Sequence, residues 1–156
     1  MADSFRVERT ETIAARPEVV FPLIDNFRSW ELWSPWDKID ADLARTYSGS
    51  DHGVGAVYEW EGKKSGAGRM EITTSTPSST IVIDLQFLKP FKNTNLTTFA
   101  LEPVAGGTCV TWTMTGAHTF FSKLMGLFMN MDKMVGKDFA AGLASLKAVS
   151  ETRQSA

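Results

Sequence analysis

The sequence has little cysteine, little histidine and no excess of charge of either sign. Its single cysteine, Cys109, cannot form a disulfide within the chain, which is typical of proteins from reducing compartments. The two histidines, His52 and His118, do not have the spacing of zinc ligands. The 16 Lys and Arg against 18 Asp and Glu give a net charge of −2, which does not favour nucleic-acid binding. We therefore expect no disulfide, no metal, no cofactor and no nucleic-acid partner.

Long apolar segments are also missing from the chain. No apolar run is long enough to span a bilayer, and the first residues, Met1 to Arg6, lack the apolar core of a signal peptide. We therefore expect a cytoplasmic protein without stable membrane insertion. The 156 residues have the usual size of one domain, and 43% of them are hydrophobic, which is enough for a core. We assign residues 1–150 to a single domain and residues 151–156 to a polar C-terminal tail.

The first part of the chain predicts one strand and two short helices. Polar residues alternate with β-formers from Phe5 to Ala14, a pattern typical of a strand. Pro17 then suits the first turn of a helix, and Pro22 should bend that helix because proline has no backbone N–H to donate. A dense aromatic segment follows over residues 27–36.

Three tryptophans in this aromatic segment, Trp30, Trp33 and Trp36, are spaced three residues apart. One interpretation is a helical segment that packs on the sheet. The other is a lid over the mouth of a cavity, because tryptophan offers a large apolar surface with one hydrogen-bond donor. We favour packing for Trp33 and leave both interpretations open for Trp30 and Trp36.

Between residues 41 and 117 the pattern alternates with a period of two. One side of each run is apolar and the other is mostly polar, as in an antiparallel sheet with one buried face. Turn residues such as Gly53, Gly55 and Gly106 separate the runs, which predicts a meander of strands. The inward positions are Ala56, Tyr58, Trp60, Gly68, Met70, Ile72, Ile81, Ile83, Leu85, Phe87, Asn95, Thr97, Phe99, Leu101, Val110, Trp112 and Met114.

After Gly116 the apolar residues follow a helical period. Leu124, Phe139 and Leu146 belong to a stripe with spacings of three and four residues, which predicts an amphipathic helix of roughly 30 residues. This helix is the one large element that could cover the apolar face of the sheet. The sequence therefore predicts an α+β fold: a curved antiparallel sheet of six to seven strands around a long C-terminal helix, with two short helices after the first strand.

Six segments carry a resemblance to a known family. They are Arg6–Arg9, Ala15–Phe21, Trp30–Trp36, Gly53–Ala56, Gly107–Met114 and Leu124–Phe128. Over residues 5–149 the chain resembles the START/Bet v 1-like superfamily, in particular the bacterial polyketide cyclase/dehydrase and lipid-transport group called SRPBCC. The resemblance implies the helix-grip fold with an internal cavity for a hydrophobic ligand. Members bind lipids, sterols, polyketides or hormones, and some catalyse cyclisation or dehydration, so the fold does not fix the chemistry.

The inward face of the strands and the helix supply the candidate ligand-binding residues. A filled core is the simpler interpretation of such a face. The abundance of Met and the glycines at 126, 136 and 142 favour a cavity, although glycine also permits close contact with the sheet. The candidates are Tyr58, Trp60, Met70, Phe87, Asn95, Thr97, Phe99, Trp112, Met114, Phe128, Met131, Met134 and Val135.

Tyr58, Asn95 and Thr97 are the polar members of this set, and a buried polar group needs a hydrogen-bond partner. They could orient the polar end of a ligand, or they could bind neighbouring side chains or water. Both interpretations stay open.

The sequence offers no convincing catalytic residue. We interpret His52 and His118 as surface residues, and Cys109 alternates onto the polar face of its strand. The inward positions assigned above contain no His, Asp or Glu. Our first hypothesis is therefore the binding of a small hydrophobic or aromatic ligand in the cavity. A polyketide cyclase or dehydratase in the same cavity is the second, and a protein-interaction domain with a filled core is the third. The oligomeric state stays open, a homodimer included.

Overall fold

The computed structural model describes residues 4–36, 43–63, 66–89, 92–117 and 131–155. Its elements confirm the predicted α+β helix-grip fold, with seven strands, two short helices after the first strand and one long C-terminal helix. They are β1 (Ser4–Ile13), α1 (Pro17–Asp25), the 3-10 helix η1 (Phe27–Leu32), β2 (Ala44–Gly49), β3 (Ala56–Gly62), β4 (Gly66–Thr76), β5 (Thr80–Lys89), β6 (Asn93–Val104), β7 (Gly107–Ala117) and α3 (Met131–Ser155).

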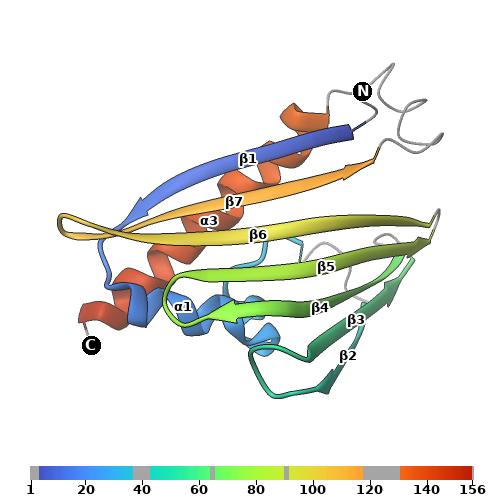
Figure 1. Ribbon diagram of the computed structural model, residues 1–156, viewed down its shortest axis with the longest axis horizontal. Helices are drawn as coiled ribbons and strands as arrows, with labels where there is room; N and C mark the ends of the chain where they lie inside the picture. Colours follow the sequence, from blue (N-terminus) through green and yellow to red (C-terminus); the bar gives the residue numbers. More distant parts are fainter. Residues whose placement is uncertain (1–3, 37–42, 64–65, 90–91, 118–130, 156) are drawn as a thin grey trace.

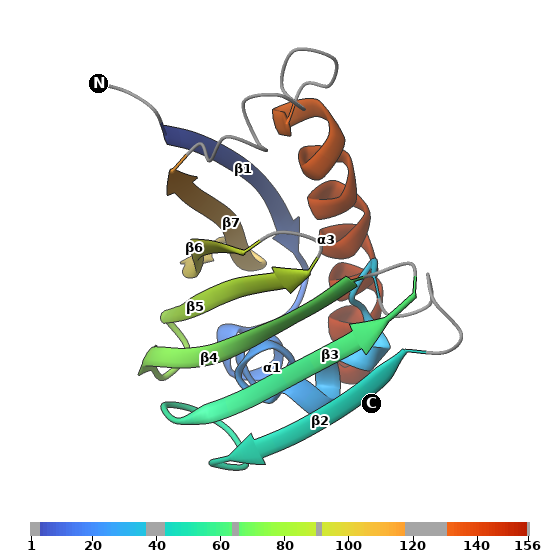
Figure 2. The same cartoon turned by 90° about the vertical axis from the view of Figure 1, so that its right-hand side faces the viewer.

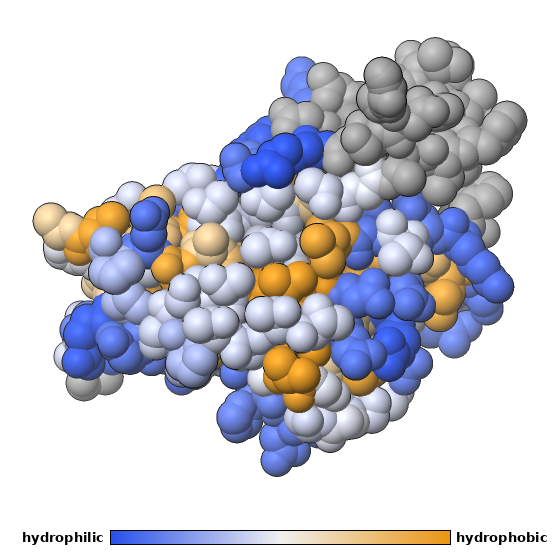
Figure 3. Space-filling view, in the orientation of Figure 1, coloured by the Kyte–Doolittle hydropathy of each residue, from blue (hydrophilic) through white to orange (hydrophobic). Residues whose placement is uncertain are grey.

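The strands form one antiparallel sheet in the order β1-β7-β6-β5-β4-β3-β2 (Figure 1). From β2 to β7 each strand pairs with the next in the sequence, as a meander should, and β1 then pairs with β7. The register aligns the predicted inward positions on one concave face. The outer face carries apolar side chains interspersed among polar and neutral ones (Figure 3).

Helix α3 lies along the edge of the sheet, where it packs mainly against β1 and also contacts α1 and η1 (Figure 2). Two of its glycines permit this close approach. A Cβ at Gly136 would overlap the guanidinium of Arg9, and a Cβ at Gly142 would lie 2.9 Å from Pro35 Cδ and 3.0 Å from Trp112 Cζ3. At both positions the missing side chain therefore allows the backbone of α3 to lie in close contact with residues of other elements. Gly126 lies outside the described residues, and none of the described helices has the length and apolar character of a membrane span.

The aromatic segment around η1 packs inside the fold. Trp30 and Trp33 are buried, and their indole N–H groups each donate a hydrogen bond of 2.8 Å to a backbone carbonyl in the last turn of α1. These bonds satisfy carbonyls that a helix end leaves without an intrahelical partner. Trp36 is half-buried, and its Nε1 donates to Asp138 of α3 at 3.1 Å. Packing is thus the role of Trp33, as predicted, and also of Trp30, whereas Trp36 joins this segment to α3.

Residues 151–155, which the sequence places in a polar tail, continue α3 instead. Glu151 accepts a hydrogen bond of 2.8 Å from the amide of Ala14, and the Gln154 side chain accepts one of 3.0 Å from the amide of Arg16. The end of the helix therefore holds the turn between β1 and α1. The hydrogen bond from Lys147, followed by that from the Ala14 amide, lowers the pKa of Glu151 below its ordinary value of 4.5.

Replacing Glu151 with glutamine should remove a pH-dependent part of the stability. A carboxyl with a lowered pKa in the folded state stabilises the fold above its unfolded pKa, and this contribution is lost as the pH falls through the folded value. The difference in the free energy of unfolding between wild type and Glu151→Gln should therefore be present at neutral pH and vanish in acid. Urea unfolding of both proteins from pH 7 down to pH 3 measures it, with Glu102→Gln as the control. A difference that stays constant over this range would contradict the prediction.

Candidate functional site

Four aromatic side chains line the concave face of the sheet on β2, β3 and β5. We call Tyr47, Tyr58, Trp60 and Phe87 the aromatic platform. Neighbouring ring centroids lie 5.3 Å apart for Tyr47 and Tyr58, 6.0 Å for Tyr58 and Trp60, and 5.9 Å for Trp60 and Phe87. All four are only half-buried and lie against the core. A row of partly exposed aromatic rings on a concave face is the kind of surface that takes an apolar ligand.

The platform depends on Gly68 in β4, which pairs with both Trp60 and Phe87. A Cβ at Gly68 would overlap the six-membered ring of Trp60 and would lie 2.8 Å from the backbone oxygen of Gln86. The absence of a side chain therefore lets the indole of Trp60 lie directly on the backbone of β4. The register of β4 and β5 shifts between Ala67 and Gly68, at the same point.

Next to the platform the concave face becomes buried and partly polar. Met70, Leu85 and Met114 are nearly covered, and Asn95 and Thr97 on β6 are 4% and 3% exposed. Within the described residues, Asn95 Oδ1 and Thr97 Oγ1 have no hydrogen-bond partner. Of the two interpretations that the sequence left open, bonding to neighbouring side chains is therefore not seen for these atoms in the described part of the chain.

The other predicted ligand-binding residues fall into two groups. Phe99 and Trp112 are 0% and 1% exposed inside an aromatic core, where Trp112 stacks on Phe99 and on Phe139 of α3 with centroid distances of 4.8 Å and 4.0 Å. Val135 is half-buried against this core. Phe128 and the side chains of Met131 and Met134 lie outside the described residues. A ligand-binding role of all these residues stays a prediction.

A tyrosine and a carboxylate that the sequence pattern did not indicate lie at the edge of the platform. The phenol of Tyr47 donates a hydrogen bond of 2.6 Å to Glu31 of η1, and the guanidinium of Arg28 lies 4.7 Å from the centroid of the Tyr47 ring. Burial, followed by the bond to Glu31, raises the pKa of Tyr47 above its ordinary range. The phenol therefore stays protonated, and this pair brings an acid–base group to the platform. The alternation Arg45-Thr46-Tyr47 is the sequence signal that could have placed Tyr47 on the inward face.

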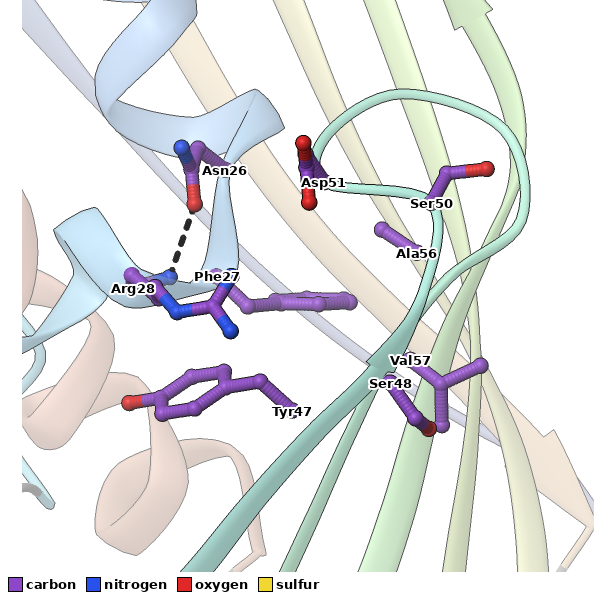
Figure 4. A pocket seen from close by; sticks show the side chains of 9 residues that line it. All are labelled: Asn26, Phe27, Arg28, Tyr47, Ser48, Ser50, Asp51, Ala56 and Val57. Atoms are coloured by element: carbon purple, nitrogen blue, oxygen red, sulfur yellow. Dashed lines mark hydrogen bonds between the residues drawn. The ribbon is translucent and has the colours of Figure 1, made fainter.

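A small hollow lies beside this pair (Figure 4). Its volume is about 10 Å³, close to the space of one water molecule. Figure 4 shows the Arg28 side chain over the ring of Tyr47, with the Phe27 ring beside the guanidinium. The hollow is too small for an organic ligand, and we keep the platform and the adjoining buried face as the candidate site. The hollow is lined by Asn26, Phe27, Arg28, Tyr47, Ser48, Ser50, Asp51, Ala56 and Val57.

Ser75, Asp25 and His52 form one further polar group, but they are not arranged as a catalytic triad. The buried carboxylate of Asp25 accepts a hydrogen bond of 2.7 Å from Ser75, and its other oxygen lies 3.5 Å from Nδ1 of His52. In a catalytic triad the histidine lies between the hydroxyl and the carboxylate and activates the hydroxyl as a nucleophile. Here the carboxylate lies between the other two groups. The His52 side chain is 71% exposed, in line with the prediction of a surface residue. His118 lies outside the described residues, and those described contain no group of three potential metal ligands.

Comparisons with known proteins agree with this fold. The family model described as polyketide cyclase / dehydrase and lipid transport matches residues 4–151. No curated protein matches the chain. Among solved structures, the di-domain ARO/CYC StfQ from the steffimycin biosynthetic pathway has a TM-score of 0.73 at 12% identity, with 98% of this chain and 52% of that chain covered. Protein MLL2253 from Mesorhizobium loti has a TM-score of 0.70 at 13% identity, with 95% and 98% covered. The Aha1 dimer from Colwellia psychrerythraea has a TM-score of 0.68 at 19% identity, with 94% and 96% covered.

Proposed function

Because the chain belongs to the polyketide cyclase/dehydrase and lipid-transport family, we propose that it binds a small hydrophobic or aromatic ligand. The ligand lies on the aromatic platform and reaches the buried face beside it. The observation that carries this proposal is the half-buried state of Tyr58, Trp60 and Phe87 on the concave side of the sheet. A contiguous group of partly exposed apolar side chains is informative, because such patches often mark ligand-binding grooves or interaction surfaces.

The chemistry of the platform favours a flat, apolar ligand. Covering about 100 Å² of apolar surface would contribute about 2.5 kcal/mol before the costs of association. Stacking on the indole of Trp60 or the ring of Phe87 adds roughly 0.5–1.5 kcal/mol for each well-placed ring pair. The rings of Tyr58 and Trp60 are inclined by only 23° to each other, so a planar ring that stacks on one of them would be nearly parallel to both.

Removing one ring of the platform should weaken binding by about tenfold, since a buried aromatic anchor typically contributes more than 1 kcal/mol. We expect this result for Trp60→Ala and for Phe87→Ala with N-phenyl-1-naphthylamine, a neutral apolar fluorescent probe. A fluorescence titration measures the Kd. Leu88→Ala is the matched control, because Leu88 follows Phe87 in β5 but is exposed, and it should leave the Kd within about twofold. Failure of the wild-type protein to bind the probe, or an equal loss in the control, would contradict the proposal.

A cyclase or dehydratase that works on the same surface is the second candidate. The hydrogen-bonded pair Tyr47–Glu31 favours it, because this pair is an acid–base group at the edge of the platform. Such an enzyme would hold a flexible polyketide-like chain against the rings and exchange protons with it. Incubation with a poly-β-ketone thioester decides between the two candidates, since a pure binding protein returns the thioester unchanged. We further propose a cytoplasmic location, and size-exclusion chromatography with light scattering would tell a monomer from a homodimer.

A further inference from the structure

Two polar side chains on the concave face are buried without a hydrogen-bond partner. Asn95 and Thr97 are 4% and 3% exposed, and Asn95 Oδ1 and Thr97 Oγ1 bind no other described atom. Buried polar atoms in native proteins nearly always have a partner, so an unpaired one calls for an explanation. Both lie on β6, two residues apart and therefore on the same face of the strand.

The positions of these two residues lead inward from the aromatic platform. Asn95 pairs with Leu85 on β5 and is thus diagonal to Phe87, a member of the platform. Thr97 lies one step deeper, between Ile83 and Met114. A ligand whose apolar body covers the platform would therefore present its inner end first to Asn95 and then to Thr97.

The described strand positions around Asn95 and Thr97 on the concave face are free of formal charge. The inward positions of β4, β5, β6 and β7 in the described chain carry no ionisable side chain. Charged residues on this face belong to the edge strands: Arg9 and Glu11 pair with Trp112 and Val110 from β1, and Arg45 pairs with Trp60 from β2. These strands lie two and four places from β6, or about 10 and 19 Å at roughly 4.8 Å per strand. A carboxylate beside Asn95 would find no counter-ion on the neighbouring described strands, and burying an unpaired charge is strongly unfavourable.

We propose that Asn95 and Thr97 select a neutral hydrogen-bonding group, a hydroxyl or N–H, at the inner end of an apolar ligand. The inference rests on the proposed function and adds the chemical class of the ligand. The amide oxygen of Asn95 only accepts hydrogen bonds, so its partner must be a donor, whereas the hydroxyl of Thr97 can donate or accept. A plain hydrocarbon would leave both atoms unpaired, and a carboxylate would bring an uncompensated charge.

Three probes of one shape separate these cases: 2-naphthol, 2-methylnaphthalene and 2-naphthoate, compared by equilibrium dialysis at pH 7. Wild type should bind 2-naphthol about tenfold more tightly than 2-methylnaphthalene, and 2-naphthoate most weakly, because one hydrogen bond that satisfies a buried group is worth about a factor of ten. Asn95→Leu should bring the ratio of the first two affinities close to 1, and Thr97→Val should lower it. Thr98→Val, which points to the outer face of the same strand, should leave it unchanged.

The stability of the ligand-free variants provides a second readout and a check on folding. Removing an unpaired polar atom from a buried site should raise the Tm of Asn95→Leu and Thr97→Val. Ser150→Ala is the matched control, because the Ser150 hydroxyl in α3 is also buried and unpaired among the described residues. It should raise the Tm without changing the preference for 2-naphthol.

The outcomes distinguish this inference from the proposed function. An unchanged preference in Asn95→Leu, or a wild type that prefers 2-methylnaphthalene or 2-naphthoate, overturns the selection of a neutral donor and leaves the binding of an apolar ligand standing. A lowered Tm in both variants would show that the two side chains serve a permanently bound water and would also overturn it. If none of the three probes binds to wild type, the proposed function itself fails.

Discussion

Replacing Trp112 with alanine is expected to lower the free energy of unfolding by about 3–5 kcal/mol, the usual cost of removing a large aromatic side chain from a core. The indole is 1% exposed and lies between two rings, Phe99 on the sheet and Phe139 on α3. The planes of Trp112 and Phe139 differ by only 6°. Trp30, Trp33 and Trp36 make T-shaped contacts with it at centroid distances of 6.2, 5.6 and 5.7 Å. Its loss would therefore open a cavity between sheet, helix and the η1 segment at once.

Urea unfolding followed by far-UV circular dichroism would measure this loss. Trp112→Phe is the matched control, because it keeps a ring between Phe99 and Phe139 and removes the indole N–H, which has no partner among the described residues. We expect it to cost clearly less than the alanine variant. Thr113→Ser, on the outer face of the same strand, keeps the hydroxyl that donates to Glu8 and should change stability by about 0.5 kcal/mol or less. A loss below about 1.5 kcal/mol for Trp112→Ala would show that the core collapses into the space and does not depend on this stack.

Much of this core could be predicted from the sequence, because a period of two decides which side of a strand is buried. Phe99, Trp112 and Met114 alternate with polar residues, and the structure buries them as expected. The packing role of Trp33 followed from its place in the aromatic segment. The role of Gly142 did not, since glycine in a helix is compatible with a gap or with close contact. The choice depends on Pro35 and Trp112, which reach the helix from other elements.

The part of the candidate site that escaped prediction depends on contacts between distant segments. Tyr47 and Glu31 are separated by 16 residues and meet because β2 pairs with β3 and η1 lies beneath them. Neither residue carries a local pattern that indicates the other. The same applies to Arg9, whose inward position on β1 follows from its pairing with Trp112. Inward positions were assigned from the sequence only between residues 56 and 114, so the charged side chains of the edge strands β1 and β2 were not placed.

The distribution of charge over the sheet agrees with the proposed selection of a neutral ligand. On the concave face of the described strands, the middle strands offer apolar and neutral polar groups, and the charged positions lie on the two edge strands. A neutral apolar molecule meets no desolvated charge when it enters between them, and a charged one loses its water without gaining a counter-ion. This agrees with an amphipathic neutral molecule as the proposed ligand.

Replacing Gly68 with alanine should disturb both the stability of the sheet and the binding of an apolar ligand. A methyl group there would overlap the ring of Trp60 and lie 2.8 Å from the backbone oxygen of Gln86, so either the indole moves or the pairing of β4 with β5 opens. We expect a loss of about 1–3 kcal/mol in the free energy of unfolding, as for other overpacked sites, and binding of N-phenyl-1-naphthylamine weakened about tenfold because Trp60 leaves the platform.

A double-mutant cycle with Trp60→Ala tests whether this effect passes through the indole. The pair Gly68→Ala and Trp60→Ala should destabilise the protein by less than the sum of the single changes, because the ring that the methyl group displaces is already gone. The residual loss would measure the contact with the Gln86 oxygen. Thr74→Ala, at an exposed position of the same strand, should change neither stability nor probe binding appreciably. Additive losses in the cycle would mean that the methyl group acts on the backbone of β5 alone, and the position of Trp60 on the sheet would then not depend on Gly68.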